Sequence, residues 1–172
     1  MVENFADLKC PACQKNMVKV FVPTAGVNVD ICLDGCGGIY FDGREFDAVN
    51  EEHEDIDTIL EALKGKTFEK VDESLPRTCP VCGSIMHKNY SSIKKEIQVD
   101  DCYSCGGKFL DNGELIKIRE EYDTDAERTA DTMAFVYETV GVALKELDEQ
   151  VERKKARRSM LKKLFDRMVY GE

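Results

Sequence analysis

The sequence predicts a small metal-bound α+β fold in which two similar modules precede one long C-terminal helix. Eight cysteines fall into two groups of four with matching spacing, and the segments around them repeat at an offset of 69 residues. Residues 123–172 contain no proline and no cysteine, and their apolar residues recur at steps of three and four. The repeat predicts the two modules, and the period predicts the helix.

Each module is expected to hold one metal ion on four cysteine thiolates. Within a group, two cysteines lie three or four positions apart in a tight turn, and a second such turn follows about twenty residues on. This spacing suits a tetrahedral Zn²⁺ with Zn–S bonds of about 2.3 Å, and four protein ligands leave no open position for water or substrate. We therefore predict two structural Zn²⁺ ions per chain. The predicted ligands are Cys10, Cys13, Cys32 and Cys36 in the first module and Cys79, Cys82, Cys102 and Cys105 in the second.

Other uses of these cysteines are weaker. Iron on four sulfurs is also tetrahedral, so iron is the alternative metal. Redox activity at the Cys-Pro-x-Cys pairs is disfavoured, because redox pairs normally open a helix after a strand in a βαβ unit. Interleaved ligand sets are disfavoured as well, because 42 residues separate Cys36 from Cys79.

Between the two cysteine turns of each module, the residues are typical of a β-hairpin, and a short apolar strand follows the double glycine. Glycines after the second cysteine of a pair suit a backbone with positive φ beside the metal, although Gln14 stands in that place after Cys13. The predicted strands are 17–22, 27–31 and 39–41 in the first module, and 86–90, 96–99 and 108–110 in the second.

A helix is expected after each module. Asp42 and Asp111 each lie three residues before a glutamate, Glu45 and Glu114, which is the pattern of a capping box. The first helix is predicted over residues 43–64. Its expected apolar side consists of Phe46, Val49, Ile56, Ile59, Leu60 and Leu63.

Gly65 is expected to end this first helix, and a polar linker follows over residues 66–75. The two histidines, His53 and His87, are expected at the surface, because both four-cysteine sites are complete without them.

The shared pattern of Cys-Pro-x-Cys, hairpin, Cys-x-x-Cys-Gly-Gly, aromatic residue and Asp-x-Gly-Glu-Leu resembles the transcription-factor-IIB-type zinc-finger (zinc-ribbon) family, found mostly in bacterial proteins. The resemblance covers about residues 8–48 and 77–117. It implies zinc binding and the ribbon fold more firmly than a role in transcription. The first copy departs from the pattern in the longer spacing between its second pair of cysteines and in Arg44 at a glycine position. The family usually has Trp where this chain has Tyr40 and Phe109.

Residues 125–169 are predicted to be helical, with Gly141 as a place for a bend. The apolar positions form a heptad-like seam that two basic residues, Lys154 and Arg158, interrupt. Two arrangements stay open at this point: an amphipathic helix that folds back on the ribbons, or a dimerising coiled coil. The apolar seam positions are Ala130, Met133, Tyr137, Val140, Leu144, Leu147, Val151, Leu161, Phe165 and Met168.

Charge is segregated along this helix. The whole chain carries −10, yet the segment from Arg153 to Arg167 carries +7, which leaves −17 for the remainder. A basic amphipathic helix serves nucleic acid, an anionic membrane surface or an acidic protein partner, or it neutralises the acidic body of its own or a sister chain. The basic residues are Arg153, Lys154, Lys155, Arg157, Arg158, Lys162, Lys163 and Arg167.

No stretch approaches the roughly 18 apolar residues of a membrane span, and the N-terminus lacks the features of a signal peptide. We therefore expect a cytoplasmic protein, in which reduced cysteines are metal ligands rather than disulfides. The expected organisation is a first zinc ribbon over 1–48, a helix and linker over 49–75, a second ribbon over 76–122 and the long helix over 123–172.

No open-coordination metal site, nucleophile–base pair or phosphate loop is recognisable, so the sequence predicts no enzyme. The favoured hypothesis is a non-enzymatic zinc-binding interaction or regulatory protein, with the C-terminal helix contacting a protein partner or a second copy. The alternative is a transcription-associated protein that binds nucleic acid through the basic end of the helix. A thiol-redox zinc switch or chaperone is the third hypothesis.

Overall fold

A computed structural model of this chain describes residues 7–43, 45–50 and 54–170, without the side chains of 125, 162–164, 166–167 and 169–170. Arg44 and His53, and the side chains of Lys162, Lys163 and Arg167, thus lie outside the described residues. The chain divides into two units, one that ends at Glu127 and one that begins at Arg128.

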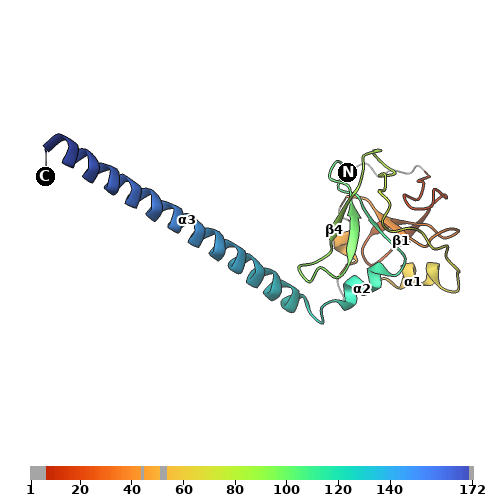
Figure 1. Cartoon of the computed structure of the whole chain (residues 1–172). Helices are drawn as coiled ribbons and strands as arrows, with labels where there is room; N and C mark the ends of the chain where they lie inside the picture. The colour runs from red at the N-terminus through yellow and green to blue at the C-terminus, as the bar shows by residue number, and fades with distance from the viewer. Residues whose placement is uncertain (1–6, 44, 51–53, 171–172) are drawn as a thin grey trace. The chain divides into compact units, whose positions relative to one another are not determined.

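The first unit is built on a single six-stranded antiparallel sheet with the strand order β1-β2-β3-β6-β5-β4. Figure 1 labels two of its strands, β1 and β4, and two helices of the same unit, α1 (Asp57–Leu63) and α2 (Glu114–Glu120). The short last strands of the two ribbons, β3 and β6, pair antiparallel at its centre, with Tyr40 opposite Phe109. Six strands form as predicted, although β5 lies two residues later than the predicted 96–99, and the two ribbons share one sheet. The strands are β1 Val18–Val22, β2 Val27–Ile31, β3 Ile39–Phe41, β4 His87–Tyr90, β5 Gln98–Asp101 and β6 Lys108–Leu110.

Both faces of the central strand pair are buried. Along β3 and β6 the side chains alternate, so Phe41 and Leu110 belong to one apolar cluster, while Tyr40 and Phe109 belong to another that includes most of the cysteines. The first cluster is completed by residues outside the sheet, among them Phe46, whose ring meets Phe41 edge-on at 5.5 Å. The side of the sheet that carries the metal sites is therefore as buried as the side that carries the apolar core.

The prediction of one helix over residues 43–64 is wrong. The structure has a 3₁₀ turn, η1 (Phe46–Ala48), and a separate helix, α1 (Asp57–Leu63). The guanidinium of Arg119 accounts for the break, because it donates hydrogen bonds to the backbone carbonyls of Val49 and Glu54. These carbonyls therefore serve a tertiary contact in place of a helical one.

After the second ribbon the chain forms helix α2 (Glu114–Glu120), as the capping pattern predicted. The carboxylates of Glu45 and Glu114 accept hydrogen bonds from the backbone N–H of Asp42 and Asp111, at 2.8 and 2.7 Å. These hydrogen bonds resemble those of a capping box, but they close the turn before each element, because α2 has Gly113 as its N-cap and η1 has Glu45. Burial raises the pKa of both glutamates to about 7.

The second unit consists of most of helix α3 (Asp125–Tyr170), which has 46 residues and a length of roughly 69 Å. The helix passes through Gly141 without interruption. The seam side chains at its middle, Val140, Leu144, Leu147 and Val151, are 40–57% exposed. Among the described residues, no helix is long and apolar enough to cross a membrane.

Candidate metal centres

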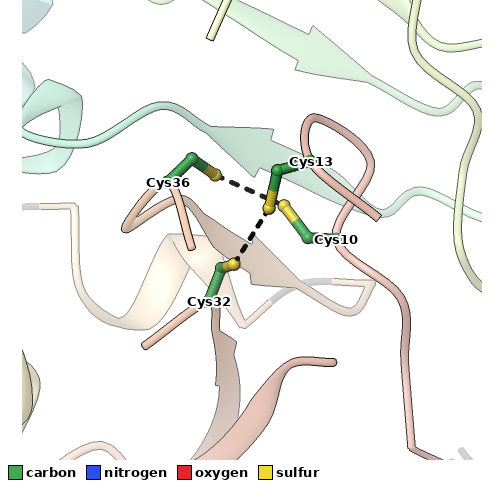
Figure 2. A group of neighbouring side chains, drawn as sticks. All are labelled: Cys10, Cys13, Cys32 and Cys36. Carbon is green, nitrogen blue, oxygen red and sulfur yellow. Dashed lines mark hydrogen bonds between the residues drawn. The ribbon is translucent and has the colours of Figure 1, made fainter. Parts of the chain in front are cut away.

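The structure brings the first four predicted ligands together between the two turns of the first ribbon. Figure 2 shows their side chains pointing toward one another, with Sγ–Sγ separations of 3.4 Å between Cys10 and Cys36 and 3.3 Å between Cys13 and Cys32. All four sulfurs lie within 4.8 Å of one another. A tetrahedron with metal–sulfur bonds of about 2.3 Å has edges of about 3.8 Å, so the cluster has the size that Zn²⁺ requires.

The second four predicted ligands form a cluster of the same size. Its Sγ–Sγ separations are 3.5 Å between Cys79 and Cys105 and 3.4 Å between Cys82 and Cys102. The ligand sets are thus sequential, one per ribbon, and not interleaved. Neither site includes a histidine among the described residues, and His87 is exposed and stacked on Tyr103 at 4.8 Å.

The turns that carry the first pair of cysteines in each ribbon have the same backbone hydrogen bonds. The N–H of Cys10 donates to the carbonyl of Lys15, and the N–H of Cys79 donates to the carbonyl of Ser84, both at 2.8 Å. Gln14 adopts a φ of 63° where the second ribbon has a glycine at 74°. The departure at Gln14 therefore leaves the turn intact, although a residue other than glycine in this region carries a small strain.

The chemistry of the donors also fits a cation. Hydrogen bonding with Cys32 and Cys36, together with burial, raises the pKa of the Cys10 thiol, so four neighbouring sulfurs do not ionise together without a positive charge. A divalent metal supplies that charge and binds the thiolate form. At the second site, hydrogen bonds from the hydroxyl and backbone N–H of Ser84 lower the pKa of Cys82 to about 6, which favours the thiolate.

The two sites differ in their cover. The predicted polar linker crosses the first site, where the Phe68 ring lies beside Gly37 and the N–H of Glu69 donates to the Gly35 carbonyl at 2.9 Å. Three of the first four cysteines are buried, whereas Cys82 and Cys105 at the second site are exposed. The first site is therefore covered by the linker, and the second site has an open side.

The two ribbons also reach into each other's metal sites. The Tyr40 ring lies over Gly107, two residues after Cys105, and the Phe109 ring lies over Gly38, two residues after Cys36. A Cβ at Gly107 would lie 2.6 Å from Tyr40 Cζ, and a Cβ at Gly38 would lie 2.8 Å from Phe109 Cε2. The second glycine of each Cys-Gly-Gly therefore makes room for an aromatic ring of the other ribbon, while Gly37 and Gly106 have the positive φ.

Arg77 is a structural residue near the second site that the sequence does not predict. It is 2% exposed, and its guanidinium pairs with both carboxylate oxygens of Asp111 at 2.7 and 2.8 Å. Its Nε lies 3.5 Å from a carboxylate oxygen of Asp100. Its Cζ lies 4.8 Å from the centroid of the Phe109 ring. Arg77 thus joins the first turn of the second ribbon to the start of α2, and no sequence signal beyond its place two residues before Cys79 marks it.

Searches of curated proteins and of solved structures give no match to this chain. A family model described as "Transcription factor zinc-finger" matches residues 9–52 and 78–121, which together are just over half of the chain. Each matched segment contains one complete four-cysteine cluster with the separations given above. The repeat, the ribbon topology and the two sulfur clusters agree with this match, and the chain belongs to the transcription-factor zinc-finger family of zinc ribbons, as a tandem pair.

Proposed function

We propose that this chain is a non-enzymatic zinc-binding interaction protein, in which the paired ribbons are a rigid base and α3 contacts a partner. The observation that carries the proposal is the helix itself. A stretch of 46 residues presents an exposed apolar seam along its length, and such a seam is stable when a second helix covers it. The ribbons supply rigidity, because each metal holds two turns together.

The metal sites support a structural role for the zinc. Four cysteine ligands at each site leave no coordination position for a substrate. We expect two equivalents of zinc per chain in elemental analysis of the purified protein. One equivalent, or iron as the main metal, would contradict this assignment.

The partner favoured by the charge pattern is a second copy of α3 in antiparallel orientation. Residues 146–152 carry four acidic and no basic side chains, and residues 153–158 carry five basic and no acidic ones. In a parallel pair, Lys154 and Arg158 of the seam would each face the same residue of the other copy, which is repulsive. In an antiparallel pair the acidic segment of each copy lies beside the basic segment of the other.

One antiparallel register satisfies both the seam and the charges. When Val151 lies opposite Lys154 of the second copy, Leu147 lies opposite Arg158 and Leu144 lies opposite Leu161. The long stems of Lys154 and Arg158 then cover aliphatic side chains while their charged ends remain in water. In the same register Asp148 and Lys155 occupy flanking positions that meet across the pair.

Light scattering of the zinc-loaded full chain tests this pairing. We expect the mass of a dimer, lost in Leu144→Asp on the seam and retained in the control Val142→Asp, which changes an aliphatic side chain of similar exposure (57% and 52%) off the seam. Antiparallel pairing predicts weaker dimers at about 500 mM than at about 50 mM salt, because salt screens the attraction. A monomeric wild type, or a dimer that salt strengthens, would contradict the proposal.

The basic end of α3 supports a second candidate, a transcription-associated protein that binds nucleic acid. About six phosphate contacts would give a log–log salt slope of the binding constant near −5. An oligonucleotide titration at several salt concentrations separates the two candidates. We expect negligible binding at physiological salt. Submicromolar binding that disappears when residues 153–172 are removed would favour the nucleic-acid function.

A further inference from the structure

We propose that Tyr40 of the first ribbon is a positioning residue of the second metal site, so that one ribbon helps to set how firmly the other holds its metal. The inference rests on the proposed metal loading of both sites. It concerns the side-chain hydroxyl of one buried residue and two sulfurs that are 39 and 65 positions further along the chain.

The side chain of Tyr40 extends from the first ribbon to the second metal site. Tyr40 lies on β3 and is fully buried. Its hydroxyl oxygen is 3.3 Å from Cys79 Sγ and 3.8 Å from Cys105 Sγ. The shorter distance, to Cys79, is that of a hydrogen bond to sulfur. The strand pair β3–β6 fixes this approach, and the lack of a side chain at Gly107 leaves space for the ring.

The chemistry of the contact favours a bound metal. A thiolate that binds a metal has no proton to donate, so the Tyr40 hydroxyl is the donor and the sulfur is the acceptor. A tyrosine hydroxyl ordinarily ionises only at about pH 10, so at neutral pH it has a proton to donate. A hydrogen bond to a metal ligand fixes the direction of the sulfur and spreads its negative charge, and such outer contacts typically change metal affinity 10–100-fold.

The contact is not reciprocal, because the two ribbons have different residues at this position. Phe109 stands opposite Tyr40 in the strand register, and its ring lies beside the first metal site in the same way. Phenylalanine has no hydroxyl, so this ring gives the first site an apolar wall and no hydrogen bond. The second site, which has two exposed cysteines, therefore receives the hydrogen bond, and the first site receives the linker.

Cadmium-113 NMR of the full chain loaded with Cd²⁺ tests the proposal site by site. We expect two ¹¹³Cd resonances in the wild type, each assigned by correlation to the Hβ protons of its own cysteines. Tyr40→Phe should shift the resonance of the second site and leave that of the first site in place. The control is Tyr122→Phe, which removes another buried tyrosine hydroxyl, from a ring that packs under Lys94, and should shift neither.

Metal release to a chelator gives the second readout. We expect Tyr40→Phe to speed release from the second site 10–100-fold and to change release from the first site less than twofold. Two unchanged resonances with unchanged release would overturn the role of Tyr40. Equal changes at both sites would also overturn it, because they indicate general loosening of the unit. A wild type with a single ¹¹³Cd resonance and one equivalent of Cd²⁺ would instead overturn the metal loading on which the inference rests.

Discussion

Replacement of Arg77 by alanine would leave two carboxylates in the interior without their main counter-charge. Asp100 and Asp111 are both almost fully buried, and Arg77 makes a two-pronged ion pair with Asp111. Asp100 would keep Lys88 at 3.2 Å, while Asp111 would have no charged partner of those described above. We therefore expect the cost to come mainly from Asp111.

Loss of one partner of a buried ion pair typically costs about 3–5 kcal/mol, because the remaining charge stays desolvated. For a unit of this size, each kcal/mol lowers the melting temperature by about 4 °C. Arg77→Ala should therefore lower Tm by roughly 12–20 °C. The double variant Arg77→Leu, Asp111→Asn should recover much of this loss, because it leaves no unpaired charge at Asp111.

The assay is thermal unfolding of the zinc-loaded protein with a fixed excess of zinc, because metal binding adds to apparent stability. The control is Arg153→Ala, which breaks an ion pair with Glu149 at 3.2 Å, where the arginine is 80% exposed. Exposed pairs of this kind are worth less than about 1 kcal/mol. A loss for Arg77→Ala no larger than that of the control would refute the reasoning about buried charge.

Three further expectations follow from the same structure. Gly107→Ala should destabilise the ribbon unit by about 1–3 kcal/mol in urea unfolding, because the added Cβ would overlap the Tyr40 ring; wild-type stability would contradict this. Glu114→Gln should stabilise the protein by roughly 1–2 kcal/mol at pH 8 and by little below pH 5, because the raised pKa of about 7 makes ionisation of Glu114 unfavourable for the fold as pH rises through 7; a pH-independent effect would contradict this. A chelator should remove metal from the site with exposed Cys82 and Cys105 first, and simultaneous loss from both sites would count against the difference in cover.

The features that the sequence predicts well are local. The strands, the capping glutamates and the two cysteine groups all depend on residues within about forty positions of one another, and the repeat presents each pattern twice. The proximity of Cys10 to Cys36 follows from a hairpin between two tight turns, which spacing alone indicates. Helix α3 is equally local, because its 3–4 period continues over many turns.

The features that the sequence does not predict depend on contacts between the ribbons. The pairing of β3 with β6 joins residues about 70 positions apart, and only this pairing explains the second glycine of each Cys-Gly-Gly. The predicted helix over 43–64 failed for a similar reason. The apolar residues of this segment do recur at helical spacing, and Val49, Ile56 and Ile59 are buried. However, Arg119 of α2 donates hydrogen bonds to two backbone carbonyls of the segment, which would accept from the segment's own N–H groups in a continuous helix.

The central strand pair has a consequence for the chain as two halves. Ile39 faces Leu110, Tyr40 faces Phe109 and Phe41 faces Lys108. Equivalent strands of the two ribbons thus pair reciprocally and antiparallel, as in the interface of an isologous dimer. A ribbon produced alone would expose β3 or β6 as an unpaired edge with an aromatic residue on it, which invites association with another ribbon. The linker makes this association intramolecular, at an effective concentration in the millimolar range for a short connection. Two separately produced halves, each loaded with metal, should therefore recombine into one sheet when mixed.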